Sequence, residues 1–368
     1  MRDTLSPLKE HPLRRPATGR LRLMTALAVA GLGLTACGSS NSTSSTQPAL
    51  SGSATSAAPK SDVKVGLAYD VGGRGDRSFN DSAAAGLDKA VKQLGVTKQE
   101  LSPNASGSDR GDNLRKLAEG GYNPIVAVGF SYAASLKTVA TSFPQTTFLI
   151  IDDSSVTLPN VRSLVFAEEQ GSYLVGAAAA LKSTAGNVGY IGGVETPLLK
   201  KFEAGFKAGA EKAKPGIKTQ VKYLSQPPDF SGFGSPDKGR ETANGMYDAG
   251  ADVVYAAAGG SGIGVFQAAK AKGKKAIGVD SDQYLSVGDP TLQPVILTSM
   301  LKRVDNAVFK ALQEVTSKQT IPAVSTFDLA SDGVGYATSG GFVDDIKGQL
   351  DGYATQIKSG AITVPTTP

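Results

Sequence analysis

Residues 63–80 read VKVGLAYDVGGRGDRSFN, and this stretch predicts a strand that ends in a loop at the edge of a parallel sheet. Apolar residues alternate with smaller or polar ones up to Tyr69, which is the period of a strand. Asp70 and a glycine-rich turn follow, and a helical pattern begins after Asn80. Open α/β sheets bind ligands at this edge. A loop that carries Asp70, Phe79 and Asn80 therefore suits recognition better than catalysis.

The remainder of the chain repeats this strand–helix unit. Strands are expected at 63–69, 124–129, 147–151, 161–166, 187–191, 219–224, 252–257, 275–279 and 294–298. Helices are expected at 81–94, 112–119, 132–141, 169–182, 198–213, 238–249, 263–271, 300–315 and 342–357. Such alternation implies an α/β fold with parallel sheets covered on both faces. One sheet does not readily hold so many strands, so two lobes are expected.

The predicted architecture is two doubly wound parallel-sheet lobes, joined by three crossovers, with a ligand cleft between them. The first crossover is expected at Phe166–Gly171, and turn-rich connectors place the others near Asp289–Pro294 and Thr320–Phe327. Hinge closure around a ligand is the natural motion of this design. The expected lobes are residues 62–167 plus 293–325, and residues 168–292 plus 326–368.

Composition excludes several classes of function. The formal net charge is +5, but most of the excess lies before residue 37, so no nucleic-acid partner is expected. The only His is His11 and the only Cys is Cys37. The folded body thus lacks the residues for Ser-His-Asp or Cys-His catalysis, for His or Cys metal sites and for disulfides. Carboxylate, Lys or Tyr chemistry stays open, as does a binding protein that carries out no chemistry. We expect the latter, with no metal and no cofactor.

The N-terminus predicts export and anchoring. Arginines precede the short apolar run Leu23–Leu34, which is typical of a secretory signal and too short to span a bilayer. The tetrapeptide Leu-Thr-Ala-Cys that ends at Cys37 resembles the bacterial lipobox; the alternative is a plain signal peptide with an incidental Cys. The resemblance implies a lipoprotein signal peptide at 1–36, lipidation of Cys37 and a location on the extracytoplasmic face of a bacterial cell membrane. Residues 37–61, rich in Ser, Thr and Ala, would form a flexible tether.

A series of short motifs runs in order through the body: Asp70-Val-Gly-Gly, Asp76-Arg-Ser-Phe-Asn80, Val128-Gly-Phe130, Ile150-Ile-Asp-Asp153, Gly189-Tyr-Ile-Gly-Gly193, Phe202-Glu-Ala-Gly-Phe206, Gly250-Ala-Asp-Val253, Ala257-Ala-Gly259, Ile277-Gly-Val-Asp-Ser-Asp-Gln283 and Thr298-Ser-Met-Leu-Lys302. Together these motifs resemble the basic membrane protein (BMP) family of substrate-binding lipoproteins, whose best-understood members are purine nucleoside receptors of ABC importers. The resemblance implies a type I periplasmic-binding fold, a nucleoside ligand and an ABC transporter permease as partner. We expect a monomer.

The same resemblance implies a role for individual residues. Phe79 would stack on the base, and Asp280 would accept hydrogen bonds from the ribose hydroxyls. Polar contacts and a close backbone approach would come from Asp70, Asn80, Asp152, Lys302 and Gly259. The second stacking ring lies in residues 226–241, which are longer and richer in Pro and Gly than in the family; Phe233 fits the register best and Phe230 is its rival.

Structural interpretations stand beside these roles. Phe79 could be a hydrophobic staple, and the acids from Asp76 to Asp81 could cap the following helix. Asp152 and Asp280 could be ordinary turn residues after strands. Lys302, placed at the start of a predicted helix, would oppose the helix dipole, which favours another role.

Three other functions stay open. A receptor of the same fold could bind a sugar or a signal molecule. A surface enzyme could cleave nucleosides with two carboxylates such as Asp70 and Asp280. An adhesin could retain a vestigial cleft. The sequence does not identify the base.

Overall fold

The computed structural model describes residues 61–368. The predicted signal peptide, Cys37 and all but the last residue of the predicted tether lie outside these residues. Within residues 61–368, no helix is both long enough and apolar enough to cross a membrane.

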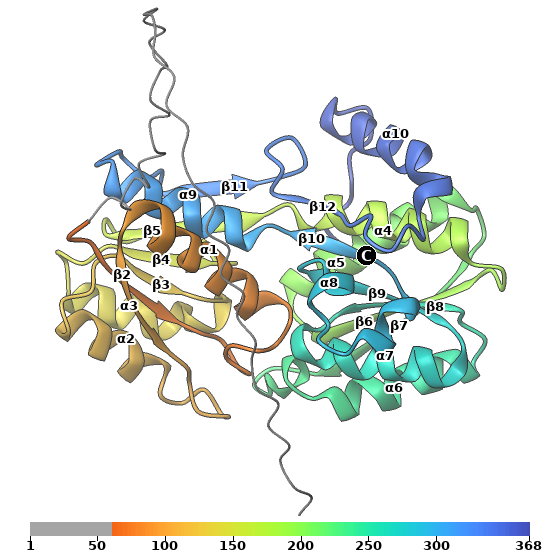
Figure 1. The fold of residues 1–368 in the computed structure, drawn as a ribbon, viewed down its shortest axis with the longest axis horizontal. Helices are drawn as coiled ribbons and strands as arrows, with labels where there is room; N and C mark the ends of the chain where they lie inside the picture. Colours follow the sequence, from red (N-terminus) through yellow and green to blue (C-terminus); the bar gives the residue numbers. More distant parts are fainter. Residues whose placement is uncertain (1–60) are drawn as a thin grey trace, which may run out of the picture. The chain divides into compact units, whose positions relative to one another are not determined.

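The first sheet contains six strands in the order β11-β5-β4-β3-β1-β2, and all of its pairs are parallel (Figure 1). Its strands are β1 (Lys64–Ala68), β2 (Thr97–Leu101), β3 (Ile125–Ala127), β4 (Phe148–Ile151), β5 (Val161–Phe166) and β11 (Val324–Phe327). The second sheet also contains six strands, in the order β12-β10-β9-β8-β6-β7. Its strands are β6 (Asn187–Val194), β7 (Lys218–Ser225), β8 (Val253–Ala257), β9 (Lys275–Asp280), β10 (Ile296–Lys302) and β12 (Val334–Tyr336), of which β12 alone is antiparallel to its neighbour.

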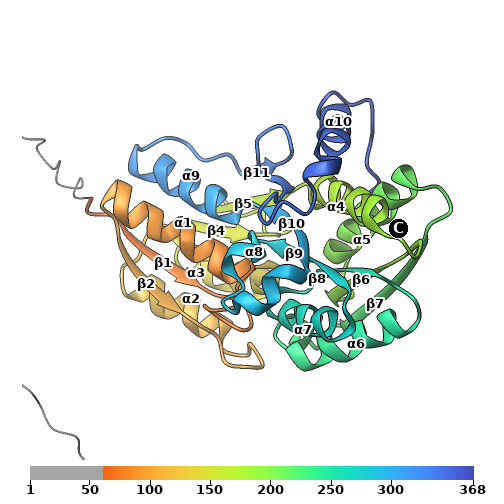
Figure 2. The same ribbon diagram turned by 45° about the vertical axis from the view of Figure 1, so that its right-hand side comes forward.

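Helices cover both faces of each sheet (Figures 1 and 2). In the first lobe α1 packs against α9 and α2 packs against α3; in the second lobe α4 packs against α5 and α6 packs against α7. The helices are α1 (Phe79–Leu94), α2 (Arg110–Glu119), α3 (Ala133–Ser142), α4 (Glu168–Lys182), α5 (Pro197–Ala213), α6 (Pro236–Asp248), α7 (Gly262–Lys272), α8 (Gln283–Ser286), α9 (Val304–Thr316) and α10 (Lys347–Lys358). The predicted doubly wound α/β architecture is therefore confirmed.

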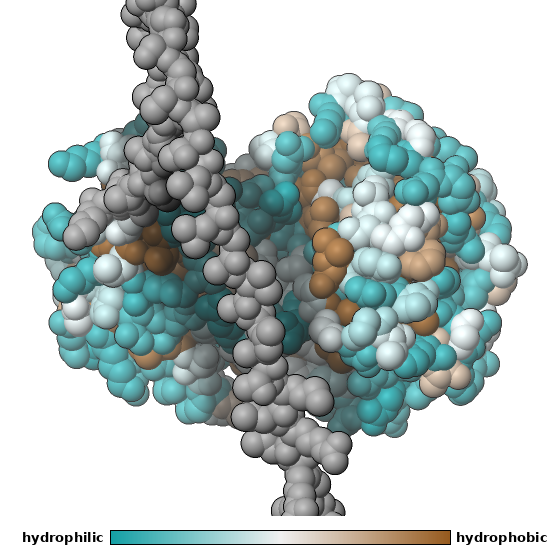
Figure 3. All heavy atoms as spheres, in the orientation of Figure 1, coloured by the Kyte–Doolittle hydropathy of each residue, from teal (hydrophilic) through white to brown (hydrophobic). Residues whose placement is uncertain are grey.

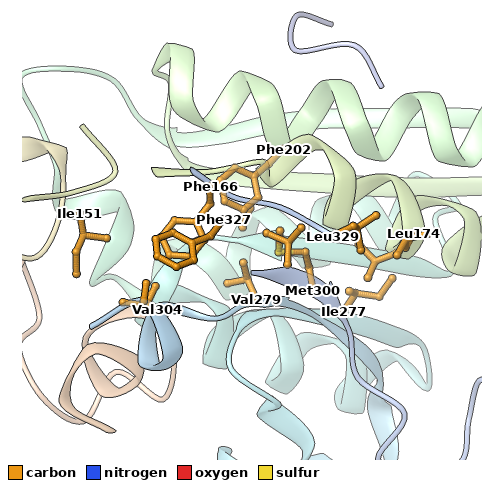
Figure 4. Packing of buried hydrophobic residues seen from close by; sticks show 14 of the residues in the cluster. Ile151, Phe166, Leu174, Phe202, Ile277, Val279, Met300, Val304, Phe327 and Leu329 are labelled. Atoms are coloured by element: carbon orange, nitrogen blue, oxygen red, sulfur yellow. The ribbon is translucent and has the colours of Figure 1, made fainter. Parts of the chain in front are cut away.

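Strand residues alternate between two buried faces. In β1, Val65 and Leu67 join the hydrophobic cluster that contains Leu87 of α1, whereas Ala68 joins the cluster that contains Leu114 of α2. Each fully buried Leu or Val stabilises the fold by about 1.5–3 kcal/mol. The first of these clusters continues through both lobes, and Figure 4 shows side chains from both, including Ile151 and Ile277.

The surface is more hydrophilic than this interior. On the face shown in Figure 3, hydrophilic residues predominate, and several hydrophobic residues gather in a band along the inner side of the right-hand lobe. Among the described residues, the large hydrophobic side chains that are strongly exposed are Leu285 and Val324.

The boundary between the lobes differs from the prediction. Strand β10 pairs with β9 in the second sheet, so residues 296–302 belong to the second lobe and the chain crosses at Arg303. The turn-rich segment near Asp289–Pro294, predicted as a crossover, is a 3-10 helix that connects two parts of the second lobe. The predicted helix start at 300–302 is also wrong, because these residues lie in the strand.

Small residues set the spacing of α4 and α5. A Cβ atom on Gly205 would lie 2.1 Å from the Glu169 carbonyl oxygen, and one on Gly209 would lie 1.9 Å from that of Tyr173. Any larger side chain would separate the two helices. The motif from Phe202 to Phe206 therefore combines buried aromatic side chains with a close helix contact.

Candidate functional site

One cavity gathers the carboxyl ends of strands from both sheets. Its empty space is about 550 Å³, a volume that includes the open solvent at its mouth. All eight residues that the sequence predicts for ligand binding line it: Asp70, Phe79, Asn80, Asp152, Phe233, Gly259, Asp280 and Lys302. The other lining residues are Val71, Asp76, Phe130, Leu198, Leu199, Phe202, Ala257 and Val279.

The loop before α1 is built by reciprocal caps. The Asp76 carboxylate accepts hydrogen bonds from the backbone N–H groups of Ser78, Asn80 and Asp81, at 2.9–3.1 Å. The Asp81 carboxylate in turn accepts from the N–H groups of Gly75 and Arg77. The capping interpretation is thus correct for Asp76, whereas Asp81 orders the loop that precedes the helix. Together the two acids present Phe79 to the cavity.

Asn80 fixes the neighbouring end of β1. Its Oδ1 accepts from the backbone N–H of Asp70 at 2.9 Å, and its Nδ2 donates to the Val71 carbonyl at 3.3 Å. Asn80 is buried, so these bonds are shielded from water. Its side chain therefore orders the loop in addition to lining the cavity.

Asp70 is held by two residues that the sequence does not indicate. The Arg110 Nη2 atom lies 2.9 Å from Asp70 Oδ1, and the Ser131 hydroxyl donates to the same oxygen at 2.8 Å. Both Asp70 and Arg110 are buried, so this is a desolvated ion pair.

Among the described residues that line the cavity, Lys302 is the cationic one. It is the last residue of β10, forms an ion pair with Asp152, and lies 3.9 Å from Glu168 Oε1. Burial alone would lower the pKa of Lys302, yet the carboxylates of Asp152, Glu168 and Asp280 raise it above its ordinary value. The lysine therefore stays charged.

Three aromatic rings surround this ammonium group. The Lys302 Nζ atom lies 4.8 Å from the ring centre of Phe79, 5.1 Å from that of Phe166 and 5.7 Å from that of Phe202. Figure 4 shows Phe166 and Phe202 within the same cluster. Such cation–π contacts stabilise a buried charge by about 2 kcal/mol.

Two of the carboxylates sit on left-handed backbone. Asp152 has φ +67° and Asp280 has φ +64°, a conformation that residues other than glycine adopt infrequently and that gathers at functional sites. Burial raises the pKa of both groups, to about 6 for Asp280. Within residues 61–368 the Asp152 Oδ1 atom is buried with no hydrogen-bond partner, so it is an acceptor free for a ligand.

Hydrogen bonds join the lobes beside Asp280. Ser281 donates from Oγ to the Ser78 carbonyl at 3.2 Å, and Gln283 donates from Nε2 to the Arg77 carbonyl at 3.0 Å. These bonds run from the second lobe to the loop before α1. The two lobes are therefore in direct contact at this edge of the cavity.

The aromatic wall distinguishes Phe233 from its rival. Phe233 lines the cavity, and Phe230 is not among the lining residues of the described chain. Phe130, whose position directly after β3 could have signalled it, also lines the cavity and lies edge-on to Phe233 at 6.4 Å. Phe202 comes from the first turns of a helix, where no pattern separates a site residue from core.

Residues 63–367 match the model of the Bmp family, described as "ABC transporter substrate-binding protein PnrA-like". The chain belongs to this family. Members of the Bmp family are ABC transporter substrate-binding proteins, a class that works outside the cytoplasm.

Individual relatives are similar in sequence to this protein over most of its length. It is 34% identical to the CD4+ T-cell-stimulating antigen of Listeria innocua, over 94% of this chain and 98% of that protein. It is 33% identical to the ABC transporter nucleoside-binding protein BmpA of Lactococcus lactis, over 85% of this chain and 92% of that protein. An ABC transporter solute-binding protein from Aeropyrum pernix has a similar structure, with a TM-score of 0.71, 28% identity and coverage of 83% of this chain and 93% of that one.

Proposed function

We propose that the protein binds a nucleoside with a purine base in this cavity and delivers it to an ABC importer. The observation that carries the proposal is the pairing of aromatic rings from both lobes, Phe79 and Phe233, with buried carboxylates in one cavity. A nucleoside offers a flat base and a ring of hydroxyl groups, which match these two kinds of side chain. The name of the Lactococcus lactis relative supports this ligand class.

The expected interactions are strong enough for micromolar binding of a nucleoside. Stacking on an aromatic ring contributes about 1–3 kcal/mol per base, and a hydrogen bond to a charged group about 1.5–3 kcal/mol. Asp280 and the unpartnered Oδ1 of Asp152 are acceptors for the ribose hydroxyls. Phe79 and Phe233 with two such carboxylates together contribute about 5–12 kcal/mol, a range that includes the roughly 8 kcal/mol that micromolar affinity requires.

We further propose that Cys37 carries the lipid that holds the protein on the extracytoplasmic face of the membrane. The Leu-Thr-Ala-Cys sequence that ends at Cys37 supports this. Labelling cells with a fatty-acid analogue should mark the protein, and Cys37→Ser should abolish the label. An equal label on the variant would contradict the anchor.

Titration calorimetry of the full-length protein in detergent tests the ligand. The panel contains purine and pyrimidine nucleosides, free bases, ribose and hexoses. Micromolar binding of purine nucleosides alone is the expected result. Binding of sugars alone would replace the proposal with a sugar receptor, conversion of inosine to hypoxanthine would identify an enzyme, and binding of nothing would favour an adhesin.

A further inference from the structure

The loop of residues 226–235 reaches from the second lobe to the first. It connects β7 to α6, and its two phenylalanines both contact Phe130, which follows β3 of the first lobe. The ring of Phe230 lies 5.9 Å from that of Phe130 in an edge-on arrangement, and that of Phe233 lies 6.4 Å from it. Phe233 lines the cavity, whereas Phe230 packs outside its lining. The two rings therefore have different surroundings.

Phe230 also packs over the Arg110 guanidinium, which holds the cavity residue Asp70. The Arg110 guanidinium lies 5.8 Å from the centre of the Phe230 ring and donates to Asp70 Oδ1 at 2.9 Å. A further bond from Arg110 Nη1 reaches the Gly107 carbonyl. Arg110 is only 6% exposed, although it lies at the boundary between the lobes. A ring from the second lobe thus packs on the same guanidinium that fixes a carboxylate of the first.

We propose that Phe230 is a positioning residue that latches the loop of residues 226–235 onto the first lobe. It acts through Phe130 and Arg110, and Arg110 transmits the contact to Asp70. The inference rests on the proposed function, since the latch closes the cavity over the bound nucleoside. Its contacts join the two lobes, so they form only when the lobes close.

A contact that forms only on closure governs dissociation more than association. Edge-on aromatic pairs and cation–π contacts each favour the state in which they form, and differences in affinity between related complexes lie mostly in the dissociation rate. Loss of the Phe230 ring should therefore release the ligand faster and leave the association rate nearly unchanged.

Stopped-flow displacement of a bound purine nucleoside from the full-length protein tests the latch. Phe230→Ala should raise the dissociation rate about tenfold, with the association rate within about threefold. Arg110→Lys keeps the charge but loses the planar guanidinium group, so it should also raise the dissociation rate. The double variant should release the nucleoside little faster than either single variant. Phe309→Ala is the matched control, because Phe309 is a half-buried ring beside Lys89 and away from the cavity. An unchanged dissociation rate in Phe230→Ala would overturn the latch.

A second readout is fluorescence of the protein saturated with a purine nucleoside, the state in which the lobes are closed. The chain contains no Trp, so Phe230→Trp places a single indole at the latch. Iodide should quench this indole weakly, and adding Arg110→Lys should increase the quenching. Quenching as strong as that of free tryptophan would refute the latch. Failure of the proposed function is a separate result, seen as no nucleoside binding by the unsubstituted protein.

Discussion

Ser78 donates a hydrogen bond from its Oγ to Oδ2 of Asp280, and this 2.6 Å contact joins the first lobe to the second. Both residues are buried. Asp280 therefore serves the contact between the lobes and lines the cavity at once. A ligand that bonds to Asp280 bonds to a group whose position already depends on closure.

The buried Asp280 carboxylate should lower the free energy of unfolding at neutral pH. Burial raises the pKa of Asp280 from its usual 3.8 to about 6. The folded protein then holds this proton more tightly than the unfolded chain, so the contribution of Asp280 to stability is fully present below pH 3.8 and is lost as pH rises through 6. Asp280→Asn should raise the free energy of unfolding at pH 7.5 by about 2 kcal/mol and weaken nucleoside binding.

Urea unfolding followed by circular dichroism measures this difference. At pH 3 the variant and the unsubstituted protein should be nearly equal, because Asp280 is then largely protonated in both the folded and the unfolded state. Asp237→Asn is the control, since the Asp237 side chain is 85% exposed. A variant that is less stable at pH 7.5 would contradict the assignment.

Lys302 should be essential for folding stability. It is 2% exposed and neutralises Asp152 and Glu168 in the interior. Lys302→Met leaves Asp152 without its ion-pair partner and Glu168 with only the half-buried Lys201, so we expect a loss of about 3–5 kcal/mol. The double variant with Asp152→Asn should recover part of the loss. The exposed Lys310→Met serves as control, and equal urea midpoints for both lysine variants would rule out the role given to Lys302.

Phe79 should contribute to the affinity for the base and not to the affinity for the ribose. Phe79→Leu keeps apolar volume and removes the aromatic face, so nucleosides should bind about ten to a hundred times more weakly. Calorimetry with the nucleoside and with ribose separates the effects, because ribose binding should not change. Phe309→Leu is the matched control. A purely structural Phe79 would show lower stability with unaltered nucleoside affinity.

The topology of the fold explains why the sequence predicts much of this site. Asp70, Asp152 and Asp280 each follow an apolar strand, and parallel strands bring such ends to one edge. Even Lys302, wrongly placed at a helix start, lies at the cavity because β10 ends there. Its ligand role and those of the other lining residues stay predictions.

Other features have no local signal in the sequence. Glu168 begins α4, where an acid is an ordinary partner of the helix dipole, and only the fold brings it to Lys302. Arg110 reaches Asp70 from a helix start that is distant along the chain. Strand β2 is a polar edge strand with exposed residues, and β11 lies in a segment that reads as a connector.

The position of β11 along the chain has a consequence for biosynthesis. This edge strand of the first sheet comes from residues 324–327, after all strands of the second sheet except β12. Domains encoded in one continuous stretch fold while the ribosome is still translating. Here the first sheet lacks its edge strand β11 until residues 324–327 have been synthesised. Strand order thus makes completion of the first sheet one of the last events in the synthesis of the chain.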